Sequence, residues 1–455
     1  MARVRFPDIS AWHIIIVSFA GIIGLGTVLL NLPIAQTCPI SFIDVFFTAA
    51  STTCVTGLAT VPISSFTFFG HCVLLALIQI GGLGLVTLSF FIASLFLNLG
   101  LATRIMAGEI LDFRFWSRIK QFLMLIIAIT FISEFVGALI LYQQFAGLDM
   151  PDGRIFSAVF HAVSAFCNAG ISLFPNNLVL FCSCPITLMT LSVLMLAGSI
   201  CFIVWYDLAK LIKSSLQSFM GKQSHCMMTL HSRIALFSSL ALICVVAYII
   251  WLLYHSLALE DFSVFIQIII AIFMAICARG PGFTTVPIIM LTPSVLCTFG
   301  LLMFIGASPG STGSGIKTTT FVLFGATILT IVRNRTCVEI SGRRIPHDQV
   351  FKVMAIVALA AFLLFCTIFT LLITEKELIT TQGWQFFDVL FEAVSAFGTC
   401  GLSTGITPHL SSIGKCIIVA TMFVGRVGSI TLALALRHKP EKVLYQYPEE
   451  RIMIG

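Results

Sequence analysis

Four short segments of this 455-residue sequence end on a glycine and could present backbone carbonyl oxygens to a dehydrated cation such as K⁺. Carbonyls that converge on one axis can replace an ion's hydration shell, and this needs unusual dihedrals, which glycine adopts readily. A single membrane glycine is more often a helix-packing residue, but four at matched positions favour an ion filter. The candidate ligand residues are Val55, Thr56 and Gly57; Asn168, Ala169 and Gly170; Gly280, Pro281 and Gly282; and Thr399, Cys400 and Gly401.

A second stretch, residues 306–320, is polar and irregular, although apolar runs, 288–305 and 321–332, lie on both sides of it. Its glycines and its proline disfavour an unbroken helix. Irregular backbone at membrane depth is tolerated only where it is buried in protein or lines a watered path. We therefore expect the stretch to lie in a pore and to act as its gate. The candidate gate residues are Gly306, Ala307, Ser308, Pro309, Gly310, Ser311, Thr312, Gly313, Ser314, Gly315 and Lys317.

The same stretch partly resembles a phosphate-binding Walker A loop, since Gly310 and Gly315 are followed by Lys317. Ile316 interrupts the Gly-Lys step that this motif requires, and no strand is expected before it, so nucleotide binding is not predicted here. Two roles are open for Lys317: it either tethers the loop or marks the cytoplasmic end of a short helix.

Arg426 lies inside the apolar run 413–436, eleven residues before Arg437. A helix rises roughly 16 Å over that distance, which is too far for easy contact with the membrane surface. An intramembrane arginine defaults to a functional role, here a cationic barrier below the filter. The alternative is a structural ion pair, with Glu134 in the apolar run 122–142 as the candidate partner.

The composition indicates which class of protein must position these residues. Hydrophobic residues make up 58% of the chain and charged residues 10%, whereas soluble domains average about 25% charged. No Asp, Glu, Lys or Arg occurs between Asp44 and Arg104. At roughly 20 apolar residues per crossing, the chain is a multi-pass membrane protein. The spans contain no His-x3-His pair or paired acids typical of a membrane enzyme, and the 15 cysteines lie mostly in apolar runs without a metal-ligand spacing.

Lysine and arginine follow a topological pattern that does not indicate a nucleic-acid surface. Of the 25 basic residues, 19 lie in five segments that alternate with loops nearly free of them: 1–10, 100–121, 206–233, 333–352 and 437–455. Cytoplasmic loops carry such an excess, so both termini and the three internal linkers are predicted to be cytoplasmic. The number of crossings is then even.

The four glycines are spaced by 113, 112 and 119 residues, which indicates one unit repeated four times. We predict an all-α polytopic membrane protein with four M1–P-loop–M2 units in a pseudo-fourfold arrangement around one pore. In each unit, two spanning helices flank a re-entrant helix too short to cross, which gives eight crossings. Successive units keep one orientation, unlike the inverted repeats of many carriers. The predicted units are residues 1–105, 106–220, 221–340 (with the broken second span) and 341–455 (with a cytoplasmic tail).

Two details of the second unit are also predicted. Its second span is expected within one apolar run, 178–205. Its re-entrant helix carries His161 where the first and fourth units have Thr48 and Glu392. A buried packing histidine is the more ordinary explanation, and a polar residue that supports the filter is the alternative.

These motifs resemble those of the Trk/Ktr/HKT superfamily of potassium transporters, and specifically the Ktr type of bacterial uptake systems. The four glycine segments, the 306–320 loop and the segment 425–428 carry the resemblance, which covers essentially the whole chain. Pro281 departs from the family pattern, in which a small flexible residue is usual. Glycine at all four filter positions is the family's K⁺-preferring pattern, so the resemblance implies K⁺ uptake. The alternative is a Na⁺-selective or poorly selective cation conductance on the same fold.

The resemblance also implies an assembly and a location. It implies a homodimer with one pore per subunit, surrounded by lipid in the bacterial cytoplasmic (inner) membrane. A cytosolic ring of nucleotide-binding (RCK) regulatory subunits would dock on the inner face. No enzyme activity, covalent cofactor, nucleic-acid partner or metal beyond K⁺ in the filter is implied. Coupling to Na⁺ or H⁺ is left open.

Overall fold

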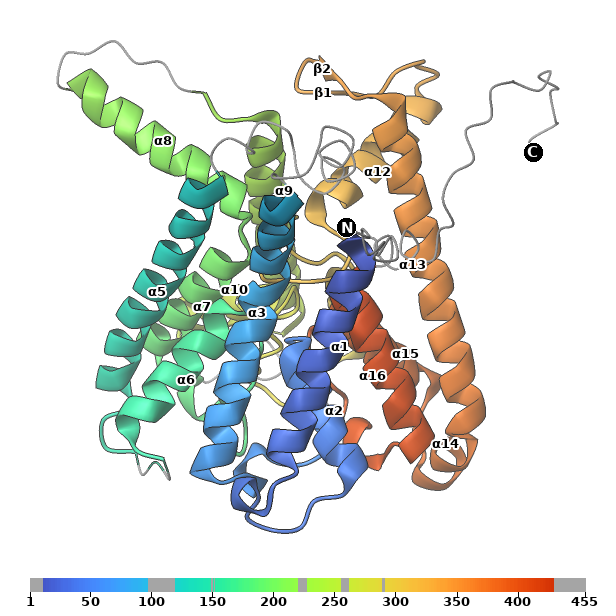
Figure 1. Ribbon diagram of the computed structural model, residues 1–455. Coiled ribbons are helices and arrows are strands. Elements are labelled where there is room, and N and C mark those ends of the chain that lie inside the picture. The colour runs from blue at the N-terminus through green and yellow to red at the C-terminus, as the bar shows by residue number, and fades with distance from the viewer. Residues whose placement is uncertain are drawn as a thin grey trace, which may run out of the picture.

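The computed structural model describes residues 11–96, 119–148, 150, 152–219, 227–254, 262–288 and 291–428. Nearly all regular structure within them is helical (Figure 1). The first unit contains α1 (Ala11–Leu30), α2 (Phe42–Thr53) and α3 (Phe68–Phe96), and the second contains α5 (Ile119–Gln144), α6 (Arg154–Phe166), α7 (Pro185–Ser199) and α8 (Phe202–Phe219). The third contains α9 (Leu230–Tyr254), α10 (Val264–Cys277), α11 (Pro293–Phe304) and α12 (Thr318–Val332), and the fourth contains α13 (His347–Thr374), α14 (Lys376–Gln382), α15 (Phe386–Gly398) and α16 (Ser412–Val427). A small antiparallel hairpin, β1 (Glu339–Ile340) and β2 (Arg343–Arg344), follows α12.

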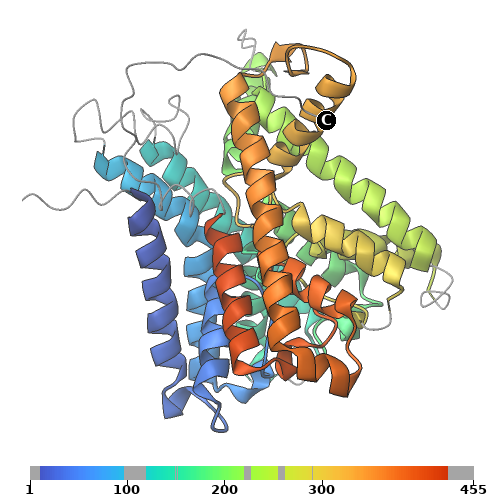
Figure 2. The same cartoon turned by 90° about the vertical axis from the view of Figure 1, so that its right-hand side faces the viewer.

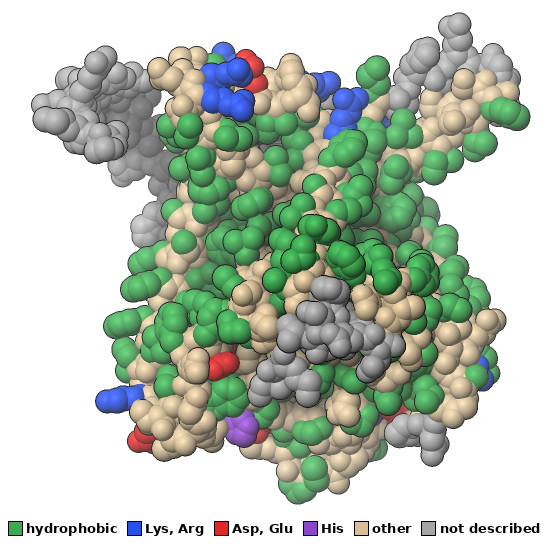
Figure 3. All heavy atoms as spheres, turned by 180° about the vertical axis from the view of Figure 1, so that it is seen from behind, with side chains coloured by type: hydrophobic (Ala, Val, Ile, Leu, Met, Phe, Trp, Pro, Cys, Tyr) green, Lys and Arg blue, Asp and Glu red, His purple; other side chains and the backbone are tan. Residues whose placement is uncertain are grey.

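The long helices present apolar side chains outward. Within the described residues, α5, α9 and α13 are each long and apolar enough to cross a membrane, and the bent pair α7–α8 would add a fourth crossing. Large side chains on them, such as Phe135 (66% exposed) and Phe365 (65% exposed), lack protein cover. Figure 3 shows apolar side chains spread over the middle of one face, with most visible Lys and Arg gathered at the end that carries the hairpin. The chain is therefore a multi-pass membrane protein.

The short helices α2, α6, α10 and α15 have 12, 13, 14 and 13 residues. At 1.5 Å per residue they are too short to cross a hydrocarbon core of about 30 Å. Two of their starts agree with signals in the sequence. The Ser41 side chain caps α2 by accepting from the Asp44 N–H, and Gln385 and Asp388 form a capping box on α15.

Contacts between units close into a ring. In each unit, the helix that follows the glycine segment packs against the short helix of the next unit: α3 on α6, α7 on α10, α11 on α15, and α16 back on α2. Figure 2 shows α16 of the fourth unit between α13 and the helices of the first unit, on the side where the ring closes. Because every unit uses the same pair of surfaces, four equivalent units surround a central axis.

The second span of the second unit is bent inside the apolar run 178–205 in which it was expected, and the sequence analysis did not predict this bend. Helix α7 ends at Ser199, and α8 leaves it at 100°. Ile200 has extended backbone (φ −76°, ψ 135°), and the Phe202 N–H donates to the carbonyl of Gly310, 3.2 Å away. The 306–320 stretch therefore takes over a hydrogen bond that a continuous helix would have made. In Figure 1, α8 runs outward along the end of the molecule that carries the hairpin.

The irregular stretch in the third unit is slightly shorter than expected. Helix α11 ends at Phe304 and α12 begins at Thr318, so residues 318–320 form the first turn of α12. We call residues 305–317 the intramembrane loop. Ile305 and Ile316 form an isolated parallel bridge at its two ends, which brings α11 and α12 together at the break.

Candidate functional site

The four glycines lie in a closed ring. A Cβ added to any one of them would lie closer than 3.0 Å to a carbonyl oxygen of a neighbouring unit. The contacts run from Gly57 to Ala169, from Gly170 to Pro281, from Gly282 to Cys400, and from Gly401 to Thr56. Only glycine fits at these positions without displacing a backbone carbonyl. The ring also places the carbonyl oxygens of Thr56, Ala169, Pro281 and Cys400 in equivalent positions around one axis.

The backbone before each glycine is unusual in three of the four units. Val55, Asn168 and Thr399 have left-handed conformations, with φ of 58°, 62° and 47°. This conformation is uncommon for any residue except glycine and costly for β-branched Val and Thr. It occurs at the same place, two residues before the glycine, in each of these units. Such strain persists only where the surroundings impose it, and it is characteristic of functional backbone.

The third unit departs from this pattern. Gly280 occupies the matching position without a positive φ, although glycine would adopt one at little cost, and Gly282 alone is left-handed there. Pro281 explains the difference, because a proline pushes the residue before it towards extended backbone. The Pro281 carbonyl nevertheless keeps its place in the ring, against Gly170.

Serines of the short helices support the ring and were missed by the sequence analysis. The Ser51 Oγ accepts from the Gly57 N–H at 3.2 Å, and the Ser395 Oγ accepts from the Gly401 N–H at 3.1 Å. The Ser164 Oγ accepts from the N–H of the residue after Gly170, also at 3.1 Å. All three lie six residues before a ring glycine, so their spacing was a usable signal. Ile276 takes this place in the third unit.

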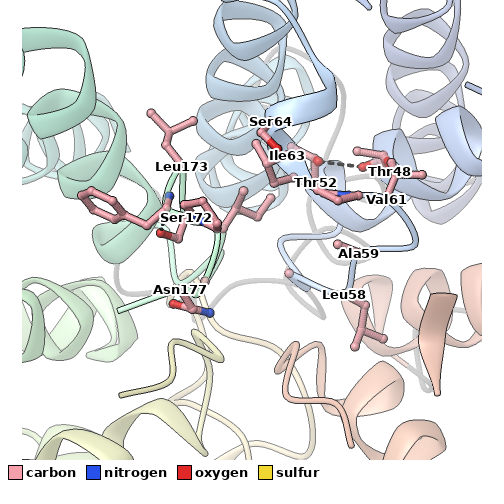
Figure 4. Close-up of a pocket in the computed structure, with 16 residues that line it drawn as sticks. Thr48, Thr52, Leu58, Ala59, Val61, Ile63, Ser64, Ser172, Leu173 and Asn177 are labelled. Carbon is pink, nitrogen blue, oxygen red and sulfur yellow. Dashed lines mark hydrogen bonds between the residues drawn. The ribbon is translucent and has the colours of Figure 1, made fainter. Parts of the chain in front are cut away.

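A small cavity lies beside the ring, between the first and second units. Its volume is about 170 Å³, and its lining includes Gly57 and Gly170 together with polar side chains of Thr48, Thr52 and Ser172. Figure 4 shows these polar side chains on short-helix and post-glycine segments of the two units. The cavity therefore gives the ring a partly polar approach on this side.

The intramembrane loop contacts the second unit immediately next to the ring. The Thr312 and Ser308 N–H groups donate to the carbonyls of Gly198 (3.1 Å) and Ser199 (3.3 Å) at the end of α7. The Thr312 hydroxyl donates to the Phe166 carbonyl at 3.2 Å and accepts from the Asn168 side chain at 2.6 Å. Ser308, Thr312 and Ser314 are buried. One residue of the loop is thus bonded directly to a residue of the ring.

Arg426 fixes the loop to two other units. Its guanidinium donates to the carbonyls of Gly81 (2.6 Å) and Gly82 (3.2 Å) on α3, to the Ser314 Oγ at 3.0 Å, and to the Thr312 carbonyl. Each of these partners is a neutral oxygen. Glu134, the candidate ion-pair partner, instead accepts from the Gln79 amide at 3.4 Å. A buried positive charge therefore lies across the loop and α3.

Two further cations hold the loop. The Lys317 ammonium donates to the Gly313 carbonyl at 2.7 Å, which agrees with a tether. Arg279, which the sequence analysis did not select, is buried and donates to the Gly306 carbonyl at 3.4 Å and to the carbonyl and hydroxyl of Ser239, both at 3.3 Å. The sequence shows Arg279 directly before Gly280, but it does not show that the Arg279 side chain reaches the intramembrane loop.

Fold and site together define a class: a multi-pass membrane protein in which four repeated units bring backbone carbonyls into one ring, as cation pathways do. The family model described as TrkH, cation transport protein, matches residues 6–447. The chain belongs to this family.

Individual relatives cover nearly the full chain. It is 33% identical to the Ktr system potassium uptake protein B of Bacillus subtilis, over 99% of this chain and 98% of the relative. It is 32% identical to the protein of the same name from Vibrio alginolyticus (97% and 94% covered) and 32% identical to the potassium/sodium uptake protein NtpJ of Enterococcus hirae (100% and 99%). Its fold matches the crystal structure of the potassium transporter TrkH from Vibrio parahaemolyticus with a TM-score of 0.71 at 17% identity, over 96% of this chain and 86% of that one.

Proposed function

We propose that this chain is the potassium-translocating subunit of a Trk/Ktr-type uptake system. The closed ring of glycines and carbonyl oxygens is the observation that carries the proposal, because a dehydrated K⁺ ion is bound by such oxygens. Relatives named for potassium uptake over nearly their whole length support the choice of ion. Residues 55–57, 168–170, 280–282 and 399–401 would form the filter, and the four units would cross the membrane eight times.

The intramembrane loop would act as the gate of this pathway. Its contacts to Asn168 of the ring and to the end of α7 support a position on the ion's path. Arg426 would be a cationic barrier beside it, since its guanidinium bonds both to the loop and to α3 without a carboxylate among its hydrogen-bond partners. Cytosolic partners could bias the gate through α12, which continues directly from the loop.

The assembly we propose is a homodimer with a cytosolic ring of RCK regulatory subunits on the inner face. Relatives carry the name of a lettered component of a Ktr system, which supports more than one kind of subunit. The gathering of basic side chains at the hairpin end supports a cytoplasmic position for that end in the bacterial inner membrane. The basic residues of segments 1–10 and 437–455 would place both termini on the same side.

A Na⁺-conducting or poorly selective pathway on the same fold is the second candidate. Two observations favour it: the third filter segment lacks the left-handed residue of the other three, and one relative is named a potassium/sodium uptake protein. Uptake of K⁺ in a host that lacks its own K⁺ uptake systems, with and without Na⁺, separates the candidates. We expect growth and K⁺ uptake at low external K⁺. Equal K⁺ and Na⁺ uptake would favour the second candidate, and no K⁺ uptake by assembled protein would refute the first.

A further inference from the structure

Two buried titratable residues occupy one matched position in the short helices. Nine residues before the ring glycines, the four units carry Thr48, His161, Phe273 and Glu392. His161 and Glu392 are 0% and 1% exposed. Both reach to the segment that follows the ring glycine of their own unit.

The two residues make the same kind of contact. Glu392 accepts from the Ser403 hydroxyl at 2.8 Å, and also from the Thr407 hydroxyl. The His161 Nε2 lies 3.1 Å from the Ser172 hydroxyl, while its Nδ1 lies 2.7 Å from the Ser157 carbonyl. Because a carbonyl only accepts, the Nδ1 carries the proton, and the Nε2 of the neutral ring accepts from Ser172.

Each serine also holds the chain that follows it. Ser172 and Ser403 both lie two residues after a ring glycine, and their Oγ atoms accept from the N–H groups of Phe174 (3.1 Å) and Gly405 (3.0 Å). In both the second and the fourth unit, the connection runs from an acceptor on the short helix, through a serine hydroxyl, to the backbone that follows the ring glycine. We call these two connections the serine clamps. Ser172 also lines the cavity beside the ring (Figure 4).

The first and third units lack a serine clamp. Thr48 donates only to the Asp44 carbonyl of its own helix, and the residue two places after Gly57 is Ala59. Phe273 has no polar atom. Since neighbouring contacts run in the order first, second, third, fourth and back to the first, the two clamped units face each other across the ring.

We propose that His161 and Glu392 are positioning residues that fix the outer end of the filter on two opposite sides and thereby set the discrimination between K⁺ and Na⁺. The proposal rests on the proposed K⁺ pathway. A buried carboxylate or imidazole that loses its donor is destabilised, so the clamp holds its serine in one place. The serine is only two residues from the ring glycine, so a shift there moves the ring carbonyls directly. A filter with serine clamps on two opposite sides, and none on the other two, is the expected result.

The test compares K⁺ and Na⁺ uptake in proteoliposomes for Glu392→Ala, Ser403→Ala and their double variant. Loss of one such hydrogen bond should lower the K⁺/Na⁺ uptake ratio about fivefold in either single variant. The double variant should fall no further than Glu392→Ala alone, since that change already breaks the contact to Ser403 together with the one to Thr407. Glu392→Gln, which keeps an acceptor oxygen, should restore most of the ratio. Ser238→Ala is the matched control, because that hydroxyl bonds only within its own helix.

Two outcomes would overturn the proposal that the serine clamps set ion discrimination. One is an unchanged ratio in assembled Glu392→Ala and Ser403→Ala, and the other is a double variant in which the two losses multiply. If Glu392→Ala does not assemble, the K⁺/Na⁺ uptake ratios of Ser403→Ala and Ser172→Ala test the proposal, because each variant removes the serine of one clamp. Absence of K⁺ uptake by the unmodified protein would instead reject the proposed function, so the two failures are distinguishable.

Discussion

At the scale of single residues, the ring depends on glycine for two separate reasons. Gly57 and Gly401 have φ of 94° and 88°, and each faces a backbone carbonyl where a Cβ would collide. Val55 and Thr399 have the same left-handed conformation two residues earlier, although both carry a Cβ. The glycines are therefore the positions at which the carbonyl ring tolerates change least.

Serine at Gly57 or Gly401 should weaken the preference for K⁺. Strain of about 1–3 kcal/mol at a left-handed position, with a carbonyl displaced, is enough to reduce the K⁺/Na⁺ uptake ratio about tenfold. Gly24→Ser is the matched control, since nothing lies within 4 Å of a Cβ there. Unchanged discrimination in both ring variants would remove these glycines from the filter.

At the same scale, a single substitution distinguishes the two roles considered for Arg426, a cationic barrier and a structural support. Arg426→Ala should leave the protein assembled and raise the K⁺ flux several-fold, because a buried positive charge beside the path disfavours a cation. Flux in proteoliposomes and size-exclusion profiles measure the two effects, with Arg426→Lys as the charge-preserving control. Loss of the assembled protein with no change in flux per assembled molecule would favour a purely structural role.

At the scale of elements, the loop and the bend in the second unit form one feature. The Phe202 N–H is satisfied by Gly310, and Thr312 and Ser308 are satisfied by the end of α7. The loop is itself the break between α11 and α12, and the bend lies between α7 and α8; the two breaks exchange the backbone hydrogen bonds that each has freed. Such an arrangement can have two states of similar energy, as a gate requires.

Deletion of residues 308–314 should raise K⁺ flux and make it less dependent on the proposed regulatory ring. Selectivity should stay the same, because the carbonyl ring is a different part of the chain. Uptake with and without the cytosolic partner measures this. A deletion protein that assembles but keeps low, regulated flux would show that the loop is not the gate.

An ion pair connects the first and fourth units at the start of α2 and α16. The Lys415 ammonium lies 2.7 Å from the Asp44 carboxylate. Burial raises the pKa of Asp44, but hydrogen bonds from Lys415 and Ser41 outweigh it, so this pKa lies below its usual value. A depressed carboxyl pKa contributes stability that is present above the unfolded-state pKa and is lost as the pH falls through the folded-state pKa.

The thermal stability of the purified protein should therefore decline as the pH falls below about 4, the usual pKa of an aspartate. Asp44→Asn should remove this part of the pH dependence, and Lys415→Met should reduce it. Asp152→Asn, which alters a carboxylate in another unit, serves as a comparison. Identical pH profiles for the unmodified protein and Asp44→Asn would contradict the role of this pair.

At the scale of the whole molecule, repetition made much of the architecture predictable. Glycines spaced by 112 to 119 residues predicted four units, and an irregular polar stretch between apolar runs located the loop to within three residues. The bend after Ser199 was not predictable, because the Phe202 N–H that it frees donates to the carbonyl of Gly310, more than 100 residues away. The partners of Arg426 were hidden for the same reason: they are backbone carbonyls, whose positions no residue type reveals. The supporting serines, by contrast, repeat at a fixed spacing and could have been found.

The central claim is that one ring of carbonyls from four units binds the transported ion. Anomalous diffraction from crystals grown in Rb⁺ or Tl⁺ tests it most directly, because both ions substitute for K⁺ and scatter strongly. We expect anomalous density on the axis between the carbonyls of Thr56, Ala169, Pro281 and Cys400, lost when Na⁺ replaces the heavier ion and reduced in Gly57→Ser. Heavy-ion density elsewhere in the protein, with none inside this ring, would contradict the account.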